Sequence, residues 1–192
     1  MYSNVGDLDI QTATSDIVSA LKAFDIEASN ATKIVDSFNE VGNNYAISAQ
    51  QIGEALQNSA SSLVVAGNDI DQSIAMITAM TEITQDAASA GAALKIMSLR
   101  IRGAKVELEE MGESTDDVAT STSKLRAEIK AMTNGFDIMK EGSDTEFKST
   151  YEIMAGLAEA IKNMDDISKT ALIEKIAGKN RANIYPYVQK CA

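Results

Sequence analysis

The stretch Ser48–Asp69, which reads SAQQIGEALQNSASSLVVAGND, carries a complete helix together with the signals that start and end it. Ser48 and Gln51 form a capping-box pattern, in which two side chains satisfy free backbone amides at the start of a helix. Gly67 marks the end, because glycine readily adopts the conformation that follows a last helical turn. Apolar residues recur between these signals at helical spacing: Ile52, Leu56, Leu63 and Val64. The stretch therefore predicts an amphipathic helix in an α-helical protein.

The same spacing of apolar residues continues on both sides of this helix. It predicts helical segments over residues 9–24, 29–41, 69–83, 86–102, 104–111, 125–132, 149–161 and 167–177. A second capping box, Ser149 with Glu152, opens one of them, and the single proline, Pro186, lies beyond the last. We therefore expect an all-α fold, a compact bundle of about seven to eight helices. Residues 136–148 are the candidate for a small β-hairpin.

The composition divides the chain into three parts. With 192 residues, the chain is long enough to bury a hydrophobic core. Residues 1–111 form the expected helical core domain, and residues 112–123, rich in Ser, Thr and Asp, form a polar linker. Residues 124–192 form a smaller helical region that we expect to pack on the first.

The charge of the chain is acidic and uneven. The net charge is −11; residues 1–98 hold 12 acids and 3 bases, whereas residues 99–192 hold 16 acids and 14 bases. Negative charge repels phosphate backbones, so we expect no specific nucleic-acid binding. No run approaches the ~20 apolar residues that a membrane span needs, so the sequence predicts no membrane segment.

The sequence lacks the residues on which most catalytic and metal sites depend. It contains no histidine, the usual general base and a frequent metal ligand. It also lacks phosphate-binding glycine loops, the residue spacings of zinc sites and the GxSxG nucleophile motif. Adjacent acids such as Asp165 and Asp166 fit helix capping better than catalysis, since neighbouring helical side chains diverge. We therefore predict no enzyme activity, no catalytic or metal-binding residue and no cofactor.

The helix predicted at 86–102 has the most distinctive composition. It begins with a run of small residues, Ala87–Ala93, that would let another helix backbone approach closely, and it ends in basic residues. The candidate residues for helix packing or partner contact are Gly91, Ala92, Leu94, Lys95, Arg100 and Arg102. Packing inside the domain and attraction of the bases to the helix dipole would explain the same residues without a partner. Both interpretations stay open at this point.

Several short motifs resemble, in order, the tail tape measure proteins of phages and prophages. They are QQIGEALQ at 50–57, VVAGNDI at 64–70, AGAALKIMSLRIRG at 90–103 and IAGKNRAN at 176–183. Together they cover nearly the whole chain. The resemblance implies an oligomeric component of the virion tail that contacts tail tube and tail assembly proteins. It also implies a role in setting tail length, with assembly in the cytoplasm of the bacterial host.

The C-terminal sequence departs from that family's pattern. Pro186 would break the alanine- and leucine-rich helix that usually continues there. Tape measure proteins are also far longer than 192 residues, so the resemblance implies a fragment or a truncated prophage copy. The alternative function is a soluble helical adaptor or regulatory module unrelated to tails. A cell-wall hydrolase with an acidic active site is the enzyme hypothesis, and the missing motifs disfavour it.

Overall fold

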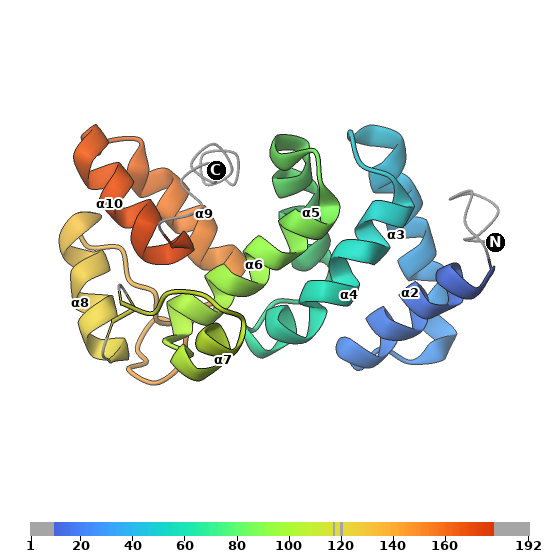
Figure 1. Ribbon diagram of the computed structural model, residues 1–192, viewed down its shortest axis with the longest axis horizontal. Coiled ribbons are helices and arrows are strands. Elements are labelled where there is room, and N and C mark those ends of the chain that lie inside the picture. The colour runs from blue at the N-terminus through green and yellow to red at the C-terminus, as the bar shows by residue number, and fades with distance from the viewer. Residues whose placement is uncertain (1–9, 117, 120, 179–192) are drawn as a thin grey trace. The chain divides into compact units, whose positions relative to one another are not determined.

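The computed structural model describes residues 10–116, 118–119 and 121–178 of the chain. These residues form nine α-helices and no β-strand, which confirms the predicted all-α fold (Figure 1). The helices are α2 (Ile10–Ala23), α3 (Ala31–Asn44), α4 (Ala49–Val65), α5 (Ile70–Thr84), α6 (Ala87–Arg102), α7 (Lys105–Glu110), α8 (Thr122–Met132), α9 (Thr150–Ile161) and α10 (Asp166–Ala177), with a short 3-10 helix η1 (Ala28–Asn30) before α3. The bounds predicted from sequence differ from these by at most about three residues.

Capping side chains define the start of several helices, as the sequence predicts. At the start of α4, the Ser48 hydroxyl accepts a hydrogen bond from the backbone amide of Gln51 at 3.1 Å. The Gln51 side chain accepts one in return from the amide of Ser48 at 2.8 Å. Equivalent capping boxes open α9 and α5: Ser149 with Glu152, and Asp69 with Gln72. These interactions are local in sequence, so they fix helix bounds before any tertiary contact forms.

The chain forms two compact units, which we call unit 1 (residues 1–95) and unit 2 (residues 96–192). The boundary between them falls within α6, whereas the sequence places a polar linker at 112–123. Val118, inside that segment, is 5% exposed and belongs to a hydrophobic cluster of unit 2. The segment therefore contributes an apolar side chain to the core of unit 2.

Helix α4 is the central element of unit 1, because it contacts α2, α3 and α5 (Figure 1). Its core-facing residues are almost fully buried: Ile52, Ala55, Leu56, Ala60 and Leu63. Gly53 lies directly against the carboxyl group of Asp16 in α2, and Asp16 is itself buried. Gln57, one turn further along α4, donates a hydrogen bond to the same carboxylate. A buried carboxyl group thus joins α2 to α4 with a hydrogen-bond partner in place.

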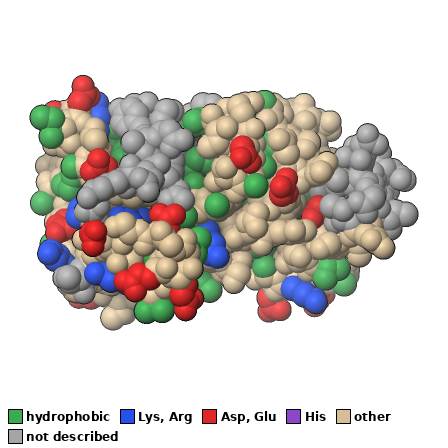
Figure 2. Space-filling view, viewed as in Figure 1, with side chains coloured by type: hydrophobic (Ala, Val, Ile, Leu, Met, Phe, Trp, Pro, Cys, Tyr) green, Lys and Arg blue, Asp and Glu red, His purple; other side chains and the backbone are tan. Residues whose placement is uncertain are grey.

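Unit 2 is built from the end of α6 together with α7 to α10. Helices α8 and α10 contact each other, and Lys175 of α10 lies 2.6 Å from the Glu128 carboxylate of α8. The buried apolar side chains of the last three helices are Leu125, Ile129, Ile153, Leu157, Ile161, Leu172 and Ile176. Figure 2 shows basic and acidic side chains interspersed over unit 2 on the face that it draws.

The segment expected to form a β-hairpin contains a single antiparallel bridge, between Met139 and Phe147. Backbone hydrogen bonds support it on both sides, from Lys140 to Glu146 at 2.9 Å and from Lys148 to Ile138 at 3.0 Å. The segment is thus a loop closed by one bridge, without a β-strand. We call residues 136–148 the bridge loop.

We predict that removing the α4 cap lowers the stability of the protein measurably. Ser48→Ala deletes the acceptor for the Gln51 amide, which should cost about 1 kcal/mol of unfolding free energy. Urea unfolding followed by circular dichroism measures this loss. Ser61→Ala is the matched control, because Ser61 is exposed inside the same helix, where alanine is favourable. Equal losses in both variants would contradict the capping role.

Candidate helix-packing and partner-contact site

Gly91 of α6 lies where the backbone of α4 comes closest. A Cβ atom at this position would lie 2.6 Å from the carbonyl oxygen of Ala55, well inside van der Waals contact. The small side chain predicted to permit close helix approach is therefore used inside unit 1, between α6 and α4. Of its neighbours, Ala92 is partly buried, Leu94 is fully buried and Lys95 is partly exposed.

Arg100 is buried, with 3% of its surface exposed. Its Nη1 group donates to the carbonyl of Ser114 at 3.0 Å, and Nε donates to the carbonyl of Lys175 at 3.3 Å. Gly178, at φ +87°, lies beside the guanidinium. Arg100 thus joins α6, the segment before α8 and the end of α10, where a cation also interacts favourably with helix carbonyls.

Arg102 has a similar role at the start of α9. It donates to the Thr150 hydroxyl at 3.1 Å and to the carbonyl of Lys148 at 3.2 Å. Its guanidinium carbon lies 5.3 Å from the centre of the Phe147 ring, within range of a cation–π interaction. Burial lowers the pKa of Arg102 to about 10, so the group still carries its charge at neutral pH. The contacts seen for both arginines are within unit 2.

A second charged site, which the sequence did not suggest, is centred on Asp137. Arg126 donates to both carboxylate oxygens of Asp137, at 2.8 and 2.7 Å, and Lys130 donates to one of them at 2.9 Å. Arg126 also reaches Asp144 at 2.6 Å. The Arg126 guanidinium holds the pKa of Asp137 well below its usual range, and the two carboxylates raise the pKa of Arg126. We call these four residues the Asp137 cluster.

Aromatic contacts hold the other side of the bridge loop. The Phe136 ring lies against Gly156 of α9, where a side chain would collide with it. Lys148 stands 4.8 Å from the centre of the same ring and donates to the carbonyl of Asp137 at 2.9 Å. The Asp137 cluster and these contacts therefore fasten the bridge loop to α8 and α9. These contacts have a structural role, since they hold the bridge loop in place.

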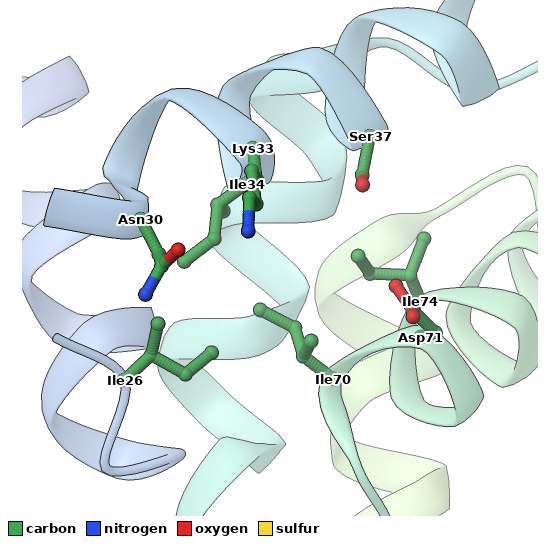
Figure 3. A pocket seen from close by; sticks show the side chains of 8 residues that line it. All are labelled: Ile26, Asn30, Lys33, Ile34, Ser37, Ile70, Asp71 and Ile74. Atoms are coloured by element: carbon green, nitrogen blue, oxygen red, sulfur yellow. The ribbon is translucent and has the colours of Figure 1, made fainter.

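Unit 1 also contains an open groove between α3 and α5, which we call the α3–α5 groove (Figure 3). Its volume is about 440 Å³. The lining residues come from the α2–η1 connection, η1, α3 and α5: Ile26, Asn30, Lys33, Ile34, Ser37, Ile70, Asp71 and Ile74. Figure 3 shows the isoleucines converging from both sides, with polar side chains around them. Because two separate stretches of the chain build it, no single sequence pattern indicates the groove.

Comparison with protein families decides what kind of protein this is. Residues 1–178 match the family described as phage-related minor tail protein. The chain belongs to this family. It is therefore a phage tail protein, and the resemblance noted in its sequence is confirmed at this level. No solved structure matches the chain.

Among the described residues, no group of three or more acidic or cysteine side chains is placed to hold a metal ion. In the same part of the tail protein, none of the helices is long and apolar enough to cross a bilayer.

We predict that Gly91→Ala destabilises the tail protein by about 1–3 kcal/mol, although alanine is the better helix former. The reason is the 2.6 Å approach of the new methyl group to the Ala55 carbonyl. Gly42→Ala in α3 is the matched control, since a Cβ there would lie an ordinary 3.4 Å from its neighbours. This control should gain about 0.5–1 kcal/mol. Thermal and urea unfolding measure both, and effects of the same sign would contradict the packing role.

We also predict that Asp137 makes the stability of the tail protein depend on pH. A lowered folded-state pKa means that the contribution is complete above the unfolded carboxyl value of about 4 and is lost as the pH falls. Asp137→Asn should therefore lower the melting temperature at pH 7, and its difference from the wild type should shrink progressively below about pH 5.

The matched control is Asp144→Asn, because the Asp144 side chain is 89% exposed and exposed ion pairs contribute little. Melting curves between pH 7 and pH 2 compare the three proteins. A difference between Asp137→Asn and the wild type that stays constant over this range would contradict the assignment, as would an equal loss in the control.

Proposed function

We propose that this chain is part of a tail tape measure protein, which sets the length of the tail during assembly. The observation that carries the proposal is membership of the minor tail protein family over residues 1–178. The ordered motifs of the sequence support the finer assignment, since they resemble tape measure proteins in particular. In this proposal the protein acts in the virion tail and is assembled in the cytoplasm of the host.

The helical composition of the chain fits such a role. A helix gains about 1.5 Å in length for each residue, so a helical protein that spans a tube can relate its residue count to the length of the tube. Most of the described residues are helical, and the longest connections are those between α7 and α8 and between α8 and α9. Arg100, Arg102 and the Asp137 cluster stabilise structure in unit 2, which is consistent with a structural protein.

The partners in this proposal are tail tube proteins, tail assembly proteins and further copies of the same chain. The proposed partner-contact positions on α6 are Gly91, Ala92, Leu94 and Lys95. In this proposal α6 is uncovered during assembly, which makes them available to a partner. Arg100 and Arg102 belong to the same proposal, although their contacts in the structure are internal. Light scattering of the purified protein over a range of concentrations measures whether copies associate.

Tail length is the direct test of the proposal. Helix-forming insertions of about 20, 40 and 60 residues would be placed in frame at Gly142, in the phage that encodes the chain. Gly142 is an exposed turn residue at φ +74°, where added chain is tolerated well. In this proposal the chain lies extended as helix along the assembling tail, so we predict tails longer by about 30 Å for each 20 residues, measured by negative-stain electron microscopy.

In the control, the same helix-forming sequence replaces a helix-forming stretch of equal length within the chain. The residue count then stays constant, and the tails should keep their normal length. Mass spectrometry of purified virions establishes that each variant is present in the tail. Tails of unchanged length that contain the lengthened protein would refute the measuring role. Absence of the protein from assembled tails would also count against it.

A further inference from the structure

The α3–α5 groove has an apolar centre and a polar rim. Ile34 and Ile74 are buried at its base, whereas Ile26 and Ile70 are only partly buried and remain accessible. Figure 3 shows Lys33 and Ser37 extending from α3 toward the groove. An apolar centre flanked by a few polar groups is typical of sites that bind another molecule.

The walls of the groove suit a helix more than a small molecule. Both long walls are helices, and Ile70 and Ile74 lie one turn apart on α5, so their side chains form a ridge along one wall. Apolar side chains of an added helix, repeating every three or four residues, would fit between this ridge and Ile34 on the α3 side. The groove is open to solvent rather than enclosed.

The charge around the groove indicates the net charge that a bound partner should carry. The stretches that line it run from residue 26 to 37 and from 70 to 74, and they contain three acidic residues and one lysine, so their net charge is −2. Asp71 lines the α5 wall, and the one lysine, Lys33, lies on the α3 wall. Such a surface attracts a basic partner and repels nucleic acid and anionic lipid.

We propose that the α3–α5 groove is a docking site for an amphipathic helix of a partner protein, with lysine or arginine residues flanking its apolar stripe. The isoleucines bind the apolar stripe, and Asp71 with the surrounding acids attracts the basic flanks. Asn30 and Ser37 supply hydrogen-bonding groups at the rim. The proposal does not depend on the tape measure role, because a tail protein of any role needs contacts with its neighbours.

A designed peptide tests the proposal directly. The probe is a fluorescein-labelled helical peptide of about sixteen residues, with leucines at helical spacing on one face and lysines elsewhere. Binding to the full-length protein is measured by fluorescence anisotropy. Two control peptides have the same length: one with the leucine positions scrambled, and one with glutamate in place of lysine. We expect binding of the probe alone, at least about tenfold tighter than either control.

Charge variants of the protein separate the groove from the general acidity of the chain. Asp71→Lys should weaken binding of the probe about fivefold, and Lys33→Glu should strengthen it about threefold, since both residues line the groove. Glu54→Lys is the matched control for the first variant. It makes the same change in net charge at an exposed position of α4 outside the lining, and should alter binding less than about twofold.

A second pair of variants, one in the groove and one outside it, tests the apolar part of the site. Ile70→Thr keeps a β-branched side chain but removes apolar surface from the groove, and should weaken binding about tenfold. Ile167→Thr makes the same change at an 84% exposed position of unit 2 and should leave binding unchanged. Circular dichroism confirms that each variant is folded.

Methyl spectra locate the peptide on the protein. With isoleucine δ1 methyl groups labelled, the probe should shift the signals of Ile26, Ile34, Ile70 and Ile74 and leave that of Ile167 in place. Equal binding of the scrambled peptide, equal effects of Asp71→Lys and Glu54→Lys, or shifts confined to other methyl groups would each overturn the proposal. Failure here would leave the tail-length experiment unaffected, so the two proposals are tested separately.

Discussion

The close approach of neighbouring helices to α4 is the constraint on which unit 1 depends. Gly91 lets α6 lie against the carbonyl of Ala55, and Gly53 makes room for the buried carboxylate of Asp16. Neither position leaves space for a larger side chain. Because protein interiors are packed as densely as organic crystals and Gly91 meets backbone atoms, the contact at Gly91 cannot be relaxed without moving a helix. The remaining core of α4 forms around these two points.

In unit 2, charged and aromatic side chains join the helices and the bridge loop, in addition to glycine contacts. Arg100 and Arg102 satisfy backbone carbonyls near the ends of α10 and α9, and the Asp137 cluster holds the bridge loop on α8. This use of cations in the interior changes the functional interpretation of the basic end of α6. In the structure its arginines serve the fold of unit 2, and the α3–α5 groove is the more accessible surface for a partner.

The sequence predicted the helices well because their signals are local. The capping box of Ser48 and Gln51 and the apolar spacing that follows it act over a few residues, as do the acids that begin α5 and α10. The structure places Gly91, one of the residues that the sequence suggested for helix packing or partner contact, against the Ala55 carbonyl. Such features can be read from one segment at a time.

The features that the sequence did not reveal all depend on residues far apart in the chain. The Asp137 cluster joins α8 to the bridge loop, and Arg100 reaches Lys175 of α10. Val118 is buried because Ile96 and Leu108 lie beside it, although its neighbours in sequence are typical of a linker. The α3–α5 groove likewise exists only once α5 has packed beside the stretch that contains η1 and α3.

Amide hydrogen exchange of the full-length protein tests the central role of α4 most directly. Amides that open only when the whole unit unfolds exchange slowest, whereas those at the periphery exchange through local opening. We predict that the amides of Leu56 and Ala60 in α4 are the slowest in unit 1, at least about tenfold slower than those in the outer turns of α2 and α3. Exchange in α4 as fast as in those outer turns would contradict the account.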